Sequence, residues 1–431
     1  MHPARLIRRS PLRLAAGLAA AAVAATTPAS AAAQSHPSKY LFVWTGDGAR
    51  KVSDFLAVLD GDPSSKTYGH VLASVAVGRT ATMPHHTEYT MPADGMLLAN
   101  GWAAGTTFLF DLRDPRHPKL AAEFGSVGGY SFPHTFTRLP NGHLLATFQS
   151  HGAAYRPPGG LVELDERGHL IRSASAMGPG MDTLHAWPYS VIADPAHDRA
   201  LSTSTPMELP KWQPGPPGTW RWGYVDSIVT NQVQLWRLSD LALLKTITLP
   251  RAPHGNYDWY PAEPVVLPDG SYYVSTFSCG IYHITDVTAP DPHVAFVYSL
   301  PGGATPATSC AVPVVVGHFW IEPVPVLPGL IALDISNPAK PVEASRLVLD
   351  RRFVWPHWAS ADPNAGRLVL TGSDQGYVLV VNVDPKTGAL SLDRNFRDER
   401  TGAVGVSLDG RTWPQGFIAH AFVHGTVFGP R

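Results

Sequence analysis

Leu59-Asp60-Gly61-Asp62-Pro63 ends an apolar segment and opens a turn, and sequence of this kind recurs along the chain. Asp and Asn side chains bond their own backbone two residues on, and Pro fixes the turn, so each occurrence predicts the exit of a β-strand. The key Asp or Asn stands at Asp60, Asp111, Asp165, Asp240, Asp286, Asp334 and Asn382. The steps between them are 46–54 residues long, except one of 75, and such steps match the length of a four-stranded propeller blade.

Seven such turns predict an all-β, seven-bladed β-propeller. The composition agrees, because the chain has 41 Pro, 39 Gly and only 16% charged residues. Apolar segments at 39–44 and 55–59 precede the first turn, and another at 417–428 follows the last. We therefore expect N- and C-terminal strands to close the ring, since closure removes exposed sheet edges. The long step contains a Pro- and Trp-rich insertion near 206–223, which we expect to be a rim loop.

The N-terminus resembles an export signal. Four Arg precede the apolar run 14–25, and Ala29-Ser30-Ala31 offers a cleavage site. Arg8-Arg9 also resembles a twin-arginine signal, with an ordinary secretory signal as the alternative. We therefore expect residues 1–34 to be removed, leaving 35–431 as a single propeller domain that is periplasmic or secreted. No later apolar run reaches the roughly 18 residues of a spanning helix, so we expect no membrane contact in the mature form.

Charge and cysteine content narrow the function classes. The formal charge is −1 and no basic run is present, which argues against a nucleic-acid partner. No phosphate-binding glycine motif or Gly-x-Ser-x-Gly elbow is present, so neither a nucleotide cofactor nor a serine hydrolase is indicated. Cys279 and Cys310 are the two cysteines. In an oxidising compartment they would form one disulfide, and two buried free thiols are the alternative.

A second repeated motif contains the candidate metal ligands. Pro84-His85-His86, Phe132-Pro133-His134 and Trp355-Pro356-His357 each have another Pro six residues after the last His. These motifs fall just before the first hairpin of a blade, hence on the innermost strand, so their side chains should meet at the axis. His420 should reach the same point from the closing blade, and His185 is a further candidate. The alternative is that these residues are ordinary ones among the 19 His and merely line a hydrated channel.

A pocket of imidazole nitrogens favours copper, then iron or zinc, because thiolates are missing and oxygen ligands would suit calcium or magnesium. Polar residues near the motifs could support the ligands or carry protons; they are Glu88, Tyr89, Asp182 and Glu263. A small apolar channel lined by Phe132, Trp187 and Trp355 would admit a methyl thiol. Core packing is the alternative role for these aromatic residues.

Four stretches resemble the selenium-binding protein family, whose bacterial members include copper-dependent methanethiol oxidases. They are Pro84-His85-His86, Phe132-Pro133-His134, the run from Val383 to Phe396 and the terminal Ala419-His420. The resemblance implies a propeller that holds copper through His85, His86, His134 and His420. It further implies oxidation of methanethiol with O2 and water to formaldehyde, hydrogen sulfide and hydrogen peroxide. Residues 87–102 contain no Cys, unlike family members known for selenium binding.

Two other functions remain open at this stage. One is a four-His non-haem iron oxygenase, which also uses a seven-bladed propeller and should have a long hydrophobic tunnel. No long apolar insertion that would form such a tunnel is present. The other is a non-catalytic propeller that binds metal or selenium.

Overall fold

The computed structural model describes residues 36–207, 228–302, 310, 312–350, 353, 355–372 and 375–430. The expected export signal at 1–34 lies outside these residues, as does nearly all of the expected insertion near 206–223. Within the described ranges the helical structure is a short 3-10 helix, η1 (Thr183–His185). No helix there has the length and apolar character needed to cross a membrane.

The described strands form seven antiparallel sheets, the blades of a ring. Blade 1 contains β29 (Ala421–Phe428), β1 (Tyr40–Asp47), β2 (Phe55–Asp60) and β3 (Val71–Ala76); blade 2 contains β4 (Pro84–Thr87), β5 (Met96–Gly101), β6 (Thr106–Asp111) and β7 (Lys119–Phe124). Blade 3 contains β8 (Tyr130–Arg138), β9 (Leu144–His151), β10 (Gly160–Leu164) and β11 (Leu170–Ser175); blade 4 contains β12 (Pro188–Asp194), β13 (Arg199–Ser204), β14 (Gln232–Arg237) and β15 (Leu243–Thr248).

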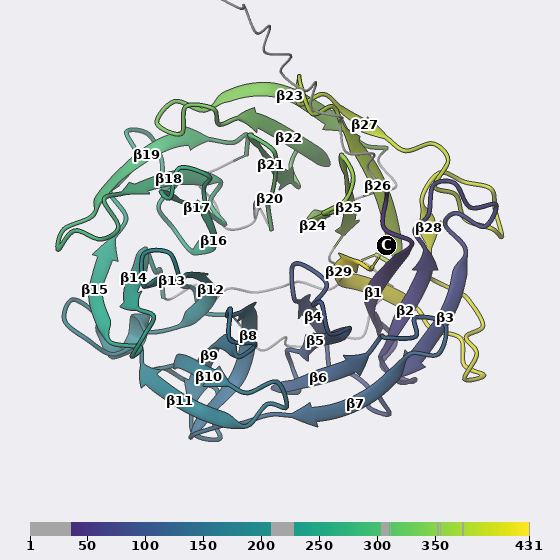
Figure 1. The fold of residues 1–431 in the computed structure, drawn as a ribbon, viewed down its shortest axis with the longest axis horizontal. Helices are drawn as coiled ribbons and strands as arrows, with labels where there is room; N and C mark the ends of the chain where they lie inside the picture. The colour runs from purple at the N-terminus through teal and green to yellow at the C-terminus, as the bar shows by residue number, and fades with distance from the viewer. Residues whose placement is uncertain are drawn as a thin grey trace, which may run out of the picture. The chain divides into compact units, whose positions relative to one another are not determined.

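The remaining blades follow in chain order around the axis (Figure 1). Blade 5 contains β16 (Pro261–Val266), β17 (Tyr272–Thr276), β18 (Gly280–Thr285) and β19 (His293–Ser299); blade 6 contains β20 (Val314–Val316), β21 (Phe319–Val324), β22 (Gly329–Asp334) and β23 (Val342–Val348). Blade 7 contains β24 (Pro356–Ala361), β25 (Arg367–Gly372), β26 (Tyr377–Val383), β27 (Leu390–Leu392) and β28 (Val406–Ser407). The predicted seven-bladed propeller is confirmed.

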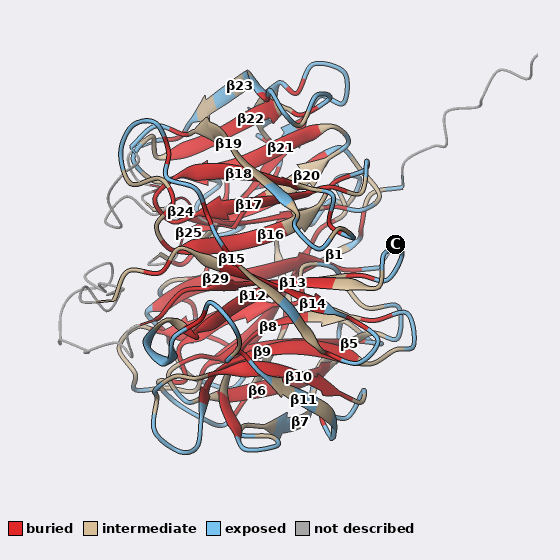
Figure 2. Cartoon of the chain, turned by 90° about the vertical axis from the view of Figure 1, so that its left-hand side faces the viewer, coloured by how far each residue is buried: buried red, intermediate tan, exposed pale blue. Residues whose placement is uncertain are grey.

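Burial within a blade falls from the axis to the rim. Middle strands such as β5 and β9 are almost entirely buried, because blades pack on both of their faces. Outer strands such as β7 and β23 alternate between exposed and half-buried residues (Figure 2). The packing between blades is aromatic and aliphatic: Trp44 of β1 lies 5.5 Å from both Phe108 and Phe110 of blade 2, measured between ring centroids. Each such buried side chain contributes about 1.5–3 kcal/mol.

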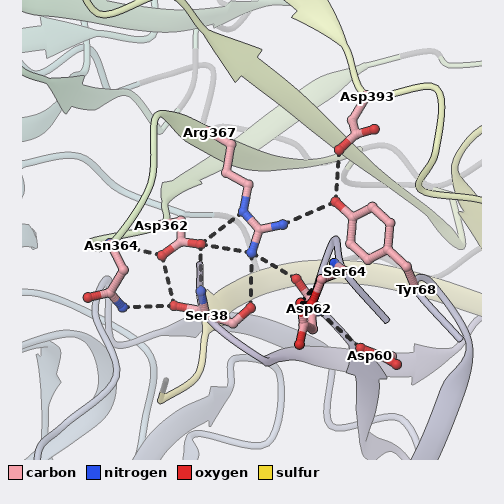
Figure 3. Close-up of polar contacts among 10 residues, drawn as sticks. Ser38, Asp60, Asp62, Ser64, Tyr68, Asp362, Asn364, Arg367 and Asp393 are labelled. Atoms are coloured by element: carbon pink, nitrogen blue, oxygen red, sulfur yellow. Dashed lines mark hydrogen bonds and ion pairs between the residues drawn. The ribbon is translucent and has the colours of Figure 1, made fainter. Parts of the chain in front are cut away.

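Strands from both ends of the chain close the ring, as predicted. The C-terminal strand β29 is the innermost strand of blade 1 and pairs antiparallel with β1, from Leu41 opposite Phe428 to Asp47 opposite Ala421. A polar network continues this closure into blade 7 (Figure 3). Arg367 lies 2.8 Å from the carboxylate of Asp362, and both side chains are buried.

Arg367 also contacts the chain on either side of the first two strands. Its guanidinium donates to the carbonyl oxygens of Ser38 (3.0 Å) and Gly61 (2.8 Å) and to the hydroxyl of Tyr68 (3.1 Å). The Asp362 carboxylate accepts hydrogen bonds from the backbone N–H and the hydroxyl of Ser38. Each guanidinium nitrogen of Arg367 therefore has at least one partner, which helps a buried ion pair to be tolerated.

Replacing Arg367 by Met should lower the free energy of unfolding by about 3–5 kcal/mol, because Asp362 would keep a buried charge without its partner. The matched control is Arg346→Met, which breaks the half-exposed pair of Arg346 with Glu343 and should cost less than about 1 kcal/mol. Urea denaturation of the three proteins measures both values. Equal losses in the two variants would contradict a special role for Arg367 in closing the ring.

Candidate metal centre

Five histidines from four innermost strands meet at the axis; we call them the His cluster. They are His85 and His86 of β4, His134 of β8, His357 of β24 and His424 of β29. All five are buried, with at most 8% of the surface exposed. The strands that carry them face the centre of the ring in Figure 1. Four of these five residues, all except His424, were predicted from the sequence to lie at the axis.

The imidazole rings of the His cluster are in contact. Nε2 of His85 lies 2.8 Å from Nε2 of His134. The His424 ring centroid is 4.2 Å from that of His85 and 4.4 Å from that of His357, and His86 lies 4.4 Å from His134. One nitrogen each from His85, His86 and His424 lie within 4.8 Å of one another, close enough to bind one metal ion.

A β-bulge explains how two adjacent histidines face the same point. Along β4, three residue steps separate Pro84 from Thr87, whereas their partners Gly101 and Ala99 on β5 are two steps apart. The extra residue breaks the strict alternation of side chains, which would otherwise turn His85 or His86 away. Bulges commonly re-aim side chains at functional sites.

The same local structure opens the innermost strand of other blades. Met83, Phe132, Tyr260 and Trp355 each precede a Pro and have φ between 57° and 62°, a left-handed conformation that is costly for non-glycine residues. The bulge follows in β8, β12, β16 and β24. Equivalent residues therefore form two layers. The first layer follows the Pro directly and contains His85, His134, Tyr189, Ala262 and His357, and the second layer contains His86, Thr135, Ser190, Glu263 and Trp358.

Hydrogen bonds orient two of the rings. Nδ1 of His134 donates to the carbonyl oxygen of Tyr189 (2.8 Å), which leaves its Nε2 unprotonated and directed at the cluster. The Thr135 hydroxyl lies 3.1 Å from Nδ1 of His134 and 3.2 Å from Nδ1 of His86. Partners of this kind fix the orientation of imidazole ligands in metal sites. Asn100 adds support, since its side chain accepts from the His86 N–H and donates to the His134 carbonyl.

Burial keeps the His cluster neutral. It lowers the pKa of His134 to about 3 and that of His357 to about 4. Burial, together with the neighbouring imidazoles, also lowers the pKa of His85, His86 and His424 well below the usual value. Neutral imidazoles are the form that binds metals. Among the described residues, Nε2 of His86 and both ring nitrogens of His357 are buried without a hydrogen-bond partner. Unpaired buried nitrogens are costly, and a metal ion would satisfy them.

An aromatic shell covers one side of the cluster. Trp102 lies 5.4 Å from the His134 ring and Tyr189 lies 4.0 Å from it. The shell continues with Met83, Met207, Tyr260 and Phe277, against which Phe132 and Tyr155 pack. Trp187, another aromatic residue expected to line a channel, joins it through Tyr155 at 5.0 Å. Trp355, the third, is half-buried and precedes β24.

Two predicted ligands lie elsewhere. His420 precedes β29, has 57% of its side chain exposed and lies 3.7 Å from Asp409, so the structure does not bring it into the His cluster. His424 occupies that place because it lies within the closing strand itself. His185 ends η1, where its Nδ1 is 2.7 Å from Asp182 near the surface. The expectation that His420 and His185 point to the axis is therefore corrected.

Of the four polar residues that the sequence suggested as ligand supports or proton carriers, two lie beside the His cluster and two have other partners. Tyr89 and Glu263 lie beside the cluster, and the Tyr89 hydroxyl donates to Glu263 at 2.5 Å. Glu88 instead pairs with Arg138 at 2.7 Å. Asp182 accepts from the backbone N–H of Leu184 and caps η1.

A disulfide holds a segment that is hydrogen-bonded to one of the His-bearing strands. Cys279 and Cys310 are bonded, with their Cα atoms 5.0 Å apart, which is one of the two alternatives that the sequence left open. Val312, two residues after Cys310, donates its N–H to the carbonyl of His357 and accepts from the N–H of Ala359. The disulfide therefore links blade 5, through Cys279, to the segment around Val312. That segment is in turn hydrogen-bonded to β24, the strand that carries His357. Fold and site together define a seven-bladed propeller with a buried histidine centre at its axis.

Comparisons with known proteins support one family. No protein-family model matches the chain. A methanethiol oxidase of Hyphomicrobium sp is 31% identical over 226 residues, 50% of this chain and 49% of that protein. Selenium-binding protein 1 of Arabidopsis thaliana is 27% identical over 192 residues, 40% of this chain and 38% of that protein. The chain therefore matches half or less of the length of these curated relatives.

The solved structures agree on the fold. A hypothetical selenium-binding protein from Sulfolobus tokodaii superposes with a TM-score of 0.70 at 16% identity, covering 90% of this chain and 93% of that one. The periplasmic gluconolactonase of Pseudomonas aeruginosa reaches 0.58 at 13% identity, covering 82% and 94%. The expected relationship is supported: the chain is a relative of the selenium-binding proteins and methanethiol oxidases.

His424→Ala should weaken metal binding more than His420→Ala, because only His424 lies in the His cluster. Changing residues that merely support a ligand typically costs 10–100-fold in metal affinity, so removing His424 should cost at least about 100-fold. Competition titration with a copper chelator measures the affinity of each variant. Loss of copper in His420→Ala with retention in His424→Ala would contradict this arrangement.

The metal-free protein should lose stability as the pH falls below about 6.5. An unfolded His takes up a proton near that pH, whereas buried His357 does so only near pH 4, so acid favours the unfolded state in between. For His357 alone the loss at pH 5 is about 2 kcal/mol. We expect His357→Leu to lose less stability than the parent between pH 7 and pH 5 in urea titrations. A matching change in His420→Leu would show that the effect is unspecific.

Proposed function

We propose that the chain is a copper-dependent oxidase of a small thiol, which converts methanethiol, O2 and water into formaldehyde, hydrogen sulfide and hydrogen peroxide. The observation that carries the proposal is the cluster of five buried, neutral histidines beneath an aromatic shell. The match to methanethiol oxidases over half of the chain supports the choice of substrate. We also infer that the protein works in the periplasm, on the strength of the signal-like N-terminus.

The donor set fits copper. The His cluster offers only imidazole nitrogens, and the carboxylate beside it, that of Glu263, accepts hydrogen bonds from Tyr89 and Ser190. Nitrogen donors suit copper, zinc and iron, whereas carboxylate-rich sites suit calcium or magnesium. His85, His86, His134 and His424 would hold the ion, with His357 as a further donor. A bound copper ion would take the substrate sulfur as a thiolate and pass electrons from it to O2.

The protein's own groups would bind and protect the substrate. Trp102, Tyr189 and Phe277 present ring surfaces near the cluster, and such surfaces suit a methyl group and exclude water. Because Nδ1 of His134 is held by the Tyr189 carbonyl, its Nε2 stays directed inward whether or not a ligand is bound. The chemistry balances: methanethiol and water give formaldehyde, hydrogen sulfide, two protons and two electrons, and O2 takes up these protons and electrons to form peroxide.

A binding propeller is the second candidate, favoured by the match to a selenium-binding protein. In that case the His cluster would bind metal without thiol turnover. A four-His iron oxygenase is a third, distinguished by iron in place of copper. Metal content separates the third from the first two, and turnover separates the first from the second.

Protein isolated from the periplasmic fraction, checked by mass for loss of about residues 1–34, should contain about one copper per chain and oxidise methanethiol. We expect one peroxide, one sulfide and one formaldehyde for each O2 consumed, because the balanced reaction requires it. His134→Ala should lower turnover at least about 100-fold, since it removes a ligand. Copper without turnover would support the binding propeller, and iron would support the oxygenase.

A further inference from the structure

The second layer of the axis holds a connected set of polar groups beside the His cluster. Glu263 of β16 is fully buried, and its Oε2 accepts hydrogen bonds from the hydroxyls of Tyr89 and Ser190, both at 2.5 Å. Its Oε1 is buried and has no hydrogen-bond partner among the described residues. A carboxyl group in such a position has one oxygen held in place and one available for a proton.

Tyr89 connects Glu263 to the imidazoles. Its ring stacks on Trp358 at 5.1 Å with an interplanar angle of 4°, which fixes the direction of its hydroxyl. The hydroxyls of Ser190 and Thr135 lie close enough to that hydroxyl to lower its pKa, against the larger effects of burial and of Glu263. Thr135 in turn lies 3.2 Å from Nδ1 of His86. Neighbouring hydroxyls of Tyr89 and Thr135 therefore lie between Glu263 and His86.

We propose that Glu263 is the proton-accepting group of the candidate metal centre and that its charge is transmitted to His86 through Tyr89 and Thr135. When Glu263 is ionised, His86 Nδ1–H donates to Thr135, Thr135 to Tyr89, and Tyr89 to the carboxylate. Carboxylates connected to an imidazole in this way increase its basicity as a ligand. When the centre gains an electron, Glu263 takes up one proton on Oε1 and compensates the added charge.

This inference rests on the proposed function and assigns a place to one of its protons. Oxidation of the thiol with water releases two protons and two electrons, and O2 takes up two of each. Glu263 would hold one of these protons between the two half-reactions. It is a positioning residue for His86, because it acts through Tyr89 and Thr135.

The charges around Glu263 favour this role. Burial raises the pKa of Glu263 to about 7, although the hydrogen bonds from Ser190 and Tyr89 act in the opposite direction. Groups with a pKa near the working pH exchange protons most effectively. Tyr89 remains protonated, because burial and the charge of Glu263 raise its pKa well above the usual value. Glu322 of β21, which is also fully buried, interacts with the charge of Glu263, and burial and Glu263 raise the pKa of Glu322 as well.

Glu322 provides a matched control. Its Oε2 accepts from the indole N–H of Trp320 at 2.7 Å, and its Oε1 has no hydrogen-bond partner among the residues described. It therefore shares the burial and the unpaired oxygen of Glu263, but among the described residues it forms no hydrogen bond with Tyr89 or Thr135. Glu263→Gln and Glu322→Gln remove the same ionisable group in similar surroundings. Tyr89→Phe keeps the ring on Trp358 and removes only the connecting hydroxyl.

The experiment uses the full protein loaded with copper and no thiol. Infrared difference spectra between the oxidised and reduced protein near pH 7.5 should show a protonated carboxyl signal gained on reduction. We expect it in the parent and in Glu322→Gln but not in Glu263→Gln. In the parent, the ratio of Cu(II) to Cu(I) affinity should rise about tenfold per pH unit around pH 7, the value for one proton per electron. It should be nearly constant in Glu263→Gln and rise less steeply in Tyr89→Phe.

Copper content and urea denaturation show whether each variant is folded and loaded, and Tyr89→Phe keeps the test decisive if Glu263→Gln is unstable. A signal and slope that persist in Glu263→Gln overturn the proposal, as does their loss in Glu322→Gln alone. A parent that binds copper and shows both effects but oxidises no thiol overturns the proposed function only. A parent that binds no copper overturns both.

Discussion

The pairing of β1 with β29 is the constraint on which the rest of the structure depends. A ring of blades is stable only when its last sheet meets its first, because an open ring leaves two blade faces and a strand edge exposed. Here the same strand that closes the ring also supplies His424. The following residue, Gly425, passes so close to β4 that a Cβ on it would lie 2.5 Å from the Thr87 nitrogen. Closing the ring and completing the His cluster are therefore a single structural event.

The polar groups at the axis are positioned by one local backbone structure that recurs in several blades. A residue with positive φ, a Pro and a bulge begin the innermost strand in several blades, and the bulge brings two consecutive side chains to the axis. In blades 2 and 3 these positions hold imidazoles and a hydroxyl, whereas in blade 5 the second position holds Glu263. Glu263 therefore shares a layer with His86, next to the layer that holds His85, His134 and His357. Both layers are removed from water, which keeps the imidazoles neutral and shifts the carboxyl toward its protonated form.

Most of the fold and much of the site could be predicted from the sequence, since both depend on local signals. Each predicted turn follows the third strand from the axis, and the Pro-His motifs lie where inner strands begin. His424 could not be predicted from such a motif, because its direction depends on the register between β29 and β1, which are far apart in sequence. A polar residue inside the apolar run 417–428 was the available signal. Glu263 was predicted as a possible proton carrier, but its place in one layer with His86 and Ser190 was not, because Tyr189 and Ala262 replace His in blades 4 and 5 and remove the motif.

The order of the strands has a consequence for biosynthesis. Ribosomes make the N-terminal strands first, and domains begin to fold while the chain is still growing. Until β29 emerges, β1 has no partner on its axial side, and His85, His86 and His134 lack the imidazole that comes from the end of the chain. A nascent or truncated chain would therefore present an incomplete set of donors next to an unpaired strand edge. The full His cluster can therefore form only near the end of synthesis, and any metal that needs all five imidazoles could be bound only after that point.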